Sequence, residues 1–162
     1  MKRCMVICGV LLLAAVDGVS MTNAPGHTPP QYAAEAAVAM SRGDYAAARA
    51  ALEEAVALKP DFAEALVGLG NACAMLGDAP AARKAYERAL KLHEQRYARE
   101  GHDPNQLQQQ VHVLLLLGRE AAARDLLADG LKRHPESKEL QLFNQGLNGL
   151  IDSEAFKKLV VK

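Results

Sequence analysis

Residues 43–49 read Gly-Asp-Tyr-Ala-Ala-Ala-Arg, and closely similar runs return twice along the chain. GDAPAAR at residues 77–83 begins 34 residues after the first copy, and GREAAAR at residues 118–124 begins 41 residues after the second. Apolar residues recur at helical spacing on both sides of each glycine, which predicts a helix, a tight turn and a second helix in every copy. The glycine suits a left-handed turn, and Asp44 and Asp78 can cap the helix that follows.

The composition limits the class of protein. The chain has 162 residues, of which 50% are hydrophobic, with 19 basic and 19 acidic side chains. This length suits one domain with one core. Because the net charge is zero, the aromatic content is 4% and Trp is absent, we expect neither a general nucleic-acid binder nor a polybasic membrane-surface protein.

The first twenty residues predict a secretory signal peptide. A basic pair at residues 2–3 precedes an apolar run at residues 4–16, and small residues follow. At ~1.5 Å per residue this run is too short to span roughly 30 Å of hydrocarbon. We expect cleavage after Ser20, with Ala15 and Ala24 as alternative sites and a buried first helix as the alternative interpretation. The mature chain would be periplasmic or secreted, with no stable membrane span.

Residues 21–30, rich in Pro and polar side chains, are predicted to be a flexible linker to a domain at residues 31–162.

Signal cleavage also changes the cysteine content. Cys4 and Cys8 would leave with the signal, so Cys73 would remain alone without an internal disulfide. Its Ala-rich helical surroundings favour buried packing over a reactive thiol.

The 34-residue helix-turn-helix period resembles the tetratricopeptide repeat. The resemblance implies an all-α fold, a right-handed α-solenoid of three helix pairs plus a C-terminal capping helix. We place the repeats at about 29–62, 63–103 and 104–137, and the cap at 138–162. The matching positions are Leu66, Leu69, Gly70, Ala82, Tyr86 and Ala89 in the middle copy, Tyr32, Ala48, Leu52, Ala55 and Pro60 in the first, and Leu107, Ala123, Leu127 and Pro135 in the third. Cys73 stands where an aromatic residue is usual.

The 41-residue step predicts a long helix. Glu94 replaces the proline that closes the equivalent helix of the first copy, so residues 94–100 add about two turns. The helix over residues 79–100 should project by roughly 10 Å, either as a spur that contacts a partner or as a tolerated insertion. After it, Asp103 reads as an N-cap with Gln106 as its capping-box partner.

The end of the chain predicts two further helices. Residues 137–143 begin a capping helix, because a solenoid needs a terminal element with one polar side. Residues 152–159 can form a last short helix, with fraying allowed at its end.

No catalytic or metal-binding set is evident in the sequence. The five histidines lack metal-ligand spacing, and no serine beyond the signal stands in a nucleophile-elbow context. We therefore expect a non-enzymatic protein without cofactor or metal.

In the resembled family, the first helices line a concave groove that accepts a peptide in extended or helical form. Matching this chain to that pattern gives the predicted groove residues: Ala33, Ala37, Met40, Glu64, Val67, Asn71, Ala74, Met75, Asn105, Gln108, His112 and Leu115. Family members that clamp a carboxylate use basic residues where this chain has Ala33, Gln108 and Gln109, so an apolar or amphipathic segment fits better. Met40 and Met75 either line this groove or fill the core between helices.

Two function classes follow. The first is an exported module that binds a peptide or helix of a partner protein, as an adaptor or chaperone in assembling an envelope complex such as a pilus, secretion or cytochrome maturation apparatus. The alternative is a structural subunit that self-associates through its groove, its long helix or its C-terminal segment. The envelope examples are implied only by similarity to exported members of the family.

Overall fold

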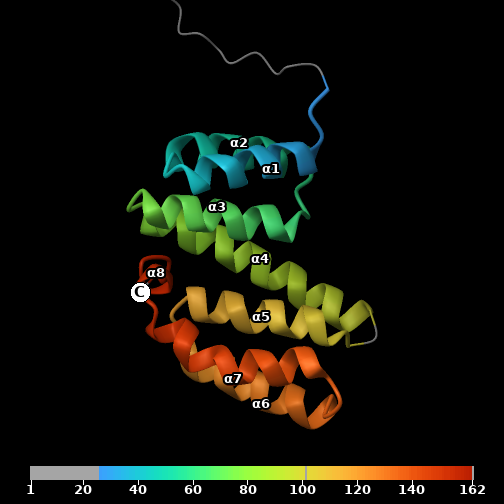
Figure 1. The fold of residues 1–162 in the computed structure, drawn as a ribbon. Helices are drawn as coiled ribbons and strands as arrows, with labels where there is room; N and C mark the ends of the chain where they lie inside the picture. The colour runs from blue at the N-terminus through green and yellow to red at the C-terminus, as the bar shows by residue number, and fades with distance from the viewer. Residues whose placement is uncertain (1–25, 101, 162) are drawn as a thin grey trace, which may run out of the picture.

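The computed structural model describes residues 26–100 and 102–161, which fold into eight helices with no strand among them (Figure 1). The predicted signal peptide and the first half of the predicted linker lie outside the described residues. The helices are α1 (Pro29–Ser41), α2 (Tyr45–Leu58), α3 (Ala63–Met75), α4 (Ala79–Arg99), α5 (Pro104–Leu116), α6 (Glu120–Arg133), α7 (Lys138–Asp152) and α8 (Glu154–Lys157).

Each repeated glycine makes the turn that the sequence predicts. Gly43, Gly77 and Gly118 have φ angles of 76°, 80° and 69°, in the left-handed region where a side chain is strained. The capping prediction is also confirmed. Asp44 accepts a hydrogen bond from the Ala47 amide at 3.0 Å, and Asp78 accepts one from the Ala81 amide at 3.1 Å.

The helices stack as successive antiparallel pairs, which confirms the all-α solenoid. α1 pairs with α2, α3 with α4, and α5 with α6, and each pair packs on the next. Figure 1 shows α1, α3, α5 and α7 on the near side, with α2, α4 and α6 behind them. We call the near side the first-helix face. α7 packs on α5 and α6 through Leu140 and Leu147, and so covers the last pair as the sequence predicts for a cap.

Small residues allow close packing within each pair. A Cβ atom at Gly70 of α3 would overlap the ring of Tyr86, which is fully buried on α4. A Cβ atom at Gly130 of α6 would come within 2.7 Å of a Leu107 methyl. Gly130 therefore stands in place of the alanine of the other copies because it leaves room for Leu107.

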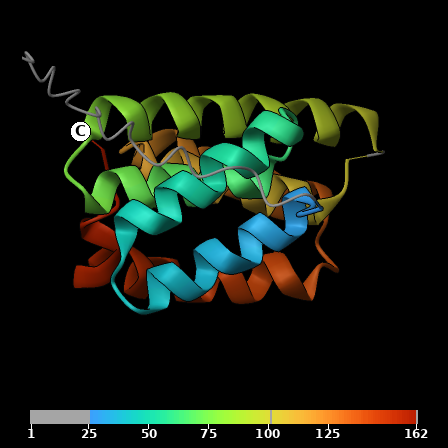
Figure 2. The same cartoon turned by 90° about the horizontal axis from the view of Figure 1, so that it is seen from above.

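The long helix α4 continues one buried stripe, as its sequence spacing predicts. Leu90, His93 and Tyr97 are all buried. The helix ends at Arg99, one residue before the predicted end. Figure 2 shows α4 running along one side of the molecule.

The two added turns of α4 contact its partner helix α3, the turn before α3, and α6 of the third pair. Arg96 donates hydrogen bonds to Glu64 at 3.0 Å and to the Asp61 carbonyl at 2.8 Å, and the Tyr97 hydroxyl accepts one from Arg133 at 3.2 Å. The extension is therefore braced on the solenoid along this side.

Two local predictions are wrong. Asp103 caps α5 through the Asn105 amide at 3.0 Å, but Gln106 does not close a capping box and instead lies 3.0 Å from Nδ1 of His93. The predicted linker also runs too far. Thr28 already caps α1 in a capping box with Gln31, so residues 29–30 are helical.

Cys73 is buried in the core, as the sequence predicts. Burial raises the pKa of its thiol above the ordinary value, although the nearby Arg49 acts in the opposite direction. A buried, protonated thiol is a poor nucleophile.

Candidate partner-binding face

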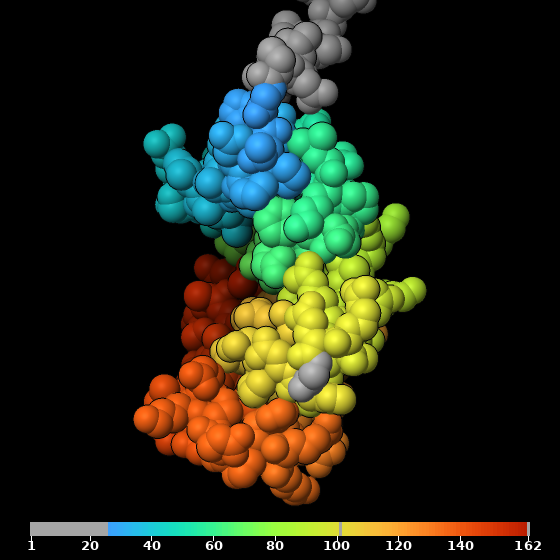
Figure 3. All heavy atoms as spheres, turned by 90° about the vertical axis from the view of Figure 1, so that its right-hand side faces the viewer, coloured from blue at the N-terminus to red at the C-terminus, as the bar shows by residue number. Residues whose placement is uncertain are grey.

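The end of the chain folds back onto the first-helix face. Residues 153–161, which we call the tail, comprise α8 and the segment that follows it. Phe156 is 5% exposed and Val161 is 3% exposed, so this end is docked and not frayed. In Figure 3 the last residues, in dark red, lie between the upper and lower parts of the stack.

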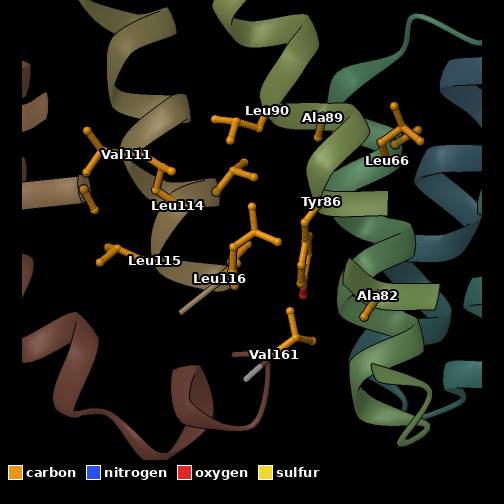
Figure 4. Close-up of a cluster of buried hydrophobic side chains, with 14 of the residues drawn as sticks. Leu66, Ala82, Tyr86, Ala89, Leu90, Val111, Leu114, Leu115, Leu116 and Val161 are labelled. Carbon is orange, nitrogen blue, oxygen red and sulfur yellow. The ribbon is translucent and has the colours of Figure 1, made fainter. Parts of the chain in front are cut away.

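Two hydrogen bonds anchor the tail backbone. The Val161 amide donates to the carbonyl of Leu116, in the last turn of α5, at 2.9 Å. The Tyr86 hydroxyl lies 3.2 Å from the Leu159 carbonyl and 2.8 Å from Oδ1 of Asn71, and it can donate to either acceptor. Figure 4 shows Tyr86 between α4 and α5, with Val161 directly beyond its hydroxyl. The tail thus bridges the middle and third helix pairs.

An aromatic contact holds the helical part of the tail. The ring centroids of His112, on α5, and Phe156 lie 5.8 Å apart, and the two ring planes make an angle of 62°. Burial lowers the pKa of His112 below its ordinary value, and the nearby His93 lowers it further. The imidazole that faces Phe156 is therefore neutral at pH 7.

A pocket remains open beside the tail. Its volume is about 630 Å³, and we call it the tail pocket. The lining residues are Leu115, Leu117, Gly118, Glu120, Ile151, Asp152, Phe156, Lys157 and Val160. Aliphatic and aromatic side chains form most of the wall, and two carboxylates and one ammonium group are its charged groups.

Three of the predicted groove residues meet at the tail. Leu115, 3% exposed, lines the tail pocket, His112 stacks on Phe156, and Asn71 bonds to Tyr86 beside Leu159. The structure therefore brings the ends of α3 and α5 together around one segment.

The other nine predicted residues are spread along α1, α3 and α5. Ala37, Glu64 and Asn105 are exposed, and Glu64 is engaged by Arg96. The half-buried ones are Ala33, Met40, Val67, Ala74, Met75 and Gln108. Met40 packs against the core, in line with the core-filling alternative.

Sequence reasoning missed the tail as part of this face. Phe156, Leu159 and Val160 recur at helical spacing after Ser153, which caps α8 by accepting from the Phe156 amide at 3.2 Å. That pattern indicates that the last short helix has an apolar side. It does not indicate which surface of the molecule that side packs against.

The part of the chain that the structure describes contains no cluster of three or more His, Cys, Asp or Glu side chains arranged to hold a metal ion. None of its helices is both long and apolar enough to cross a bilayer.

Stacked helix pairs with left-handed glycine turns and a shared first-helix face define an α-helical repeat protein. Residues 33–97 match the tetratricopeptide repeat family, and this match supports a tetratricopeptide repeat protein. Repeats of this kind generally mediate protein–protein interaction. A comparison with curated proteins gave no significant match.

Proposed function

We propose that this chain is a non-enzymatic binding module that holds a peptide or amphipathic helix of a partner protein on its first-helix face. The observation that carries the proposal is the tail pocket together with the segment docked beside it. An apolar surface that already accepts one short segment has the shape and chemistry to accept another. The family's general role in protein interaction supports the same conclusion.

The remainder of the first-helix face offers further contact area toward the N-terminal end. Ala37 on α1 is exposed, and Ala33 and Val67 are half-buried. These small apolar side chains allow close approach of a partner helix, in the way that small residues allow helices to pack.

We further propose that the module is exported and acts as an adaptor or chaperone in assembling an envelope complex. The basic pair, short apolar run and small residues at the N-terminus support export. N-terminal sequencing of the exported fraction tests this proposal. A chain that begins at or near Met21 supports it, and retention of Met1 contradicts it.

A structural subunit is the second candidate, and the docked tail favours it. A segment that fills the face of its own chain can fill the same face of a second copy by exchange. Sedimentation separates the two candidates: a monomer supports the binding module, and an oligomer whose size is independent of concentration supports the subunit.

The partner-binding proposal can be tested with two exposed alanines. Ala37 lies on α1 in the first-helix face, and Ala50 lies on α2 in the opposite layer. Crosslinking in the native compartment, followed by identification of the captured protein, supplies the readout. Ala37→Glu should weaken capture and Ala50→Glu should leave it unchanged, with helical content the same in both. Equal capture by the two variants would contradict binding on this face.

A further inference from the structure

The tail makes a shallow contact with the face that it covers. Of its nine residues, only Phe156 and Val161 are buried, whereas Glu154, Ala155 and Lys158 are exposed. α8 is a single helical turn of four residues. A turn this short has no stability of its own, so it depends on the surface beneath it.

The polar groups that hydrogen-bond to the tail have other hydrogen-bond partners when the tail leaves. The Tyr86 hydroxyl has one hydrogen and two acceptors, so Asn71 remains its partner when Leu159 leaves. The Leu116 carbonyl belongs to the last turn of α5, where carbonyl groups lack helical partners and accept from water or from a cap. Undocking therefore leaves no buried polar group without a hydrogen-bond partner, which removes one cost of opening.

We propose that the tail is a resident ligand of this face, and that the partner displaces it with a segment of the same chemistry. This inference rests on the proposed binding function and specifies its partner. The segment carries an aromatic side chain for the place of Phe156, and branched aliphatic side chains three to five positions later for those of Leu159 and Val161.

Charge adds a further requirement on the partner. Glu120 and Asp152 line the tail pocket together with Lys157, which directly follows the buried aromatic residue. Opposite charges at the rim of an interface set register and suppress wrong partners. The displacing segment should therefore carry a basic residue immediately after its aromatic residue.

Binding of the partner is then weakened by the tail. A site that its own chain occupies most of the time binds with an affinity reduced by the open fraction, so loosening the tail must strengthen binding. The tail pocket gives the incoming segment a first contact beside the docked tail.

The test uses the full chain and a synthetic peptide of residues 153–161, Ser-Glu-Ala-Phe-Lys-Lys-Leu-Val-Val, labelled with fluorescein. The undocked variant carries Phe156→Asp and Val161→Asp. The control variant carries Ala155→Asp and Lys158→Gln, which make the same charge change at exposed positions. Fluorescence anisotropy should show at least tenfold tighter binding to the undocked variant than to the wild type or the control. A second peptide, with aspartate in place of its phenylalanine, should not bind.

Equal affinity of the peptide for all three proteins would overturn the inference. So would the absence of peptide binding to an undocked variant that keeps its helical content. Unfolding of the undocked variant would also overturn it, because the tail would then be part of the core. Hydrogen exchange of the wild type gives an independent check. The Val161 amide should exchange faster than amides inside α4, and equal protection would contradict a displaceable tail.

Two further measurements distinguish this inference from self-association and from partner binding elsewhere on the face. If sedimentation finds a wild-type dimer that is lost in the undocked variant, a second copy is the occupant and the partner proposal is wrong. Ala37→Glu should not change peptide binding, because it lies on α1. Failure of partner binding on the open part of the face is therefore distinguishable from failure of the tail as a ligand.

Discussion

The hydroxyl of Tyr86 lies 3.2 Å from the backbone oxygen of Leu159, a residue 73 positions further along the chain. Tyr86 occupies the large apolar position of the middle repeat, and its ring fills the space that Gly70 leaves open. One side chain therefore serves both the packing of a helix pair and the docking of the tail. This shared use couples the solenoid to the surface that we propose for binding.

Substitution of Gly70 by alanine tests the packing of the Tyr86 ring against α3. The new Cβ would overlap the Tyr86 ring, which is fully buried. We expect Gly70→Ala to lower the free energy of unfolding by about 1–3 kcal/mol, the usual cost of overpacking. Urea denaturation measures it.

Gly146→Ala on α7 is the matched control for that experiment. Nothing lies within 4 Å of a Cβ at Gly146, and the residue is also helical. This change should be neutral or stabilising by up to about 1 kcal/mol. Similar losses in the two variants would contradict the close contact between α3 and α4.

Two turn glycines separate backbone strain from tail contact. Gly43 and Gly118 both have positive φ, so alanine at either position should cost about 1–2 kcal/mol. Space is open around a Cβ at Gly43, whereas at Gly118 it would lie 3.2 Å from the Val161 carbonyl oxygen. Only Gly118→Ala should therefore increase hydrogen exchange at the Val161 amide. Unchanged exchange there would show that the tail does not rest on this turn.

The lowered pKa of His112 predicts a dependence on pH. Because the folded state disfavours the imidazolium, the unfolded chain binds more protons below the ordinary histidine pKa of about 6.5. The contribution of this group to stability is therefore present above pH 6.5 and is lost as the pH falls toward the folded-state pKa.

Denaturation at several pH values measures this effect. His112→Gln cannot be protonated in this range, so its stability should fall less than that of the wild type between pH 7 and pH 5. An identical pH profile for the two proteins would contradict the burial of this imidazole against the tail.

The extension of α4 allows a comparison between aromatic packing and an ion pair. Tyr97 is buried, whereas Glu64 is mostly exposed in its pair with Arg96. Tyr97→Ala should cost about 3–5 kcal/mol, the range for large aromatic side chains in a core. Glu64→Ala should cost under about 1 kcal/mol, as for other exposed ion pairs. Thermal unfolding would contradict this account if the order were reversed.

The repeating part of the fold could be predicted from the sequence because its determinants are local. The glycine turns, the capping aspartates and the small residues that make room for large side chains each act within one or two helices. Gln106 shows where local reasoning fails. Its position suits a capping box, but its amide bonds to His93 on the neighbouring helix, because a buried imidazole without a partner costs more than an unfinished cap.

The candidate site was harder to predict because its determinants are not local in the sequence. Periodicity could assign His112 and Leu115 to the first-helix face, but docking of the tail depends on contacts between residues far apart in the chain. Phe156 and Val161 are apolar residues near the end of the sequence, and nothing local distinguishes a docked end from a frayed one. Leu116 and Val161 are separated in the chain by α6, α7 and α8, so their contact depends on the tertiary fold.

The position of the tail is the claim on which the binding account depends most directly. Nuclear Overhauser effects between the ring protons of Phe156 and the imidazole protons of His112 measure it in solution, since the two rings lie 5.8 Å apart. The account predicts these cross-peaks at pH 7, together with cross-peaks between Val161 and Leu116. Their absence, with random-coil chemical shifts for residues 153–161, would contradict it.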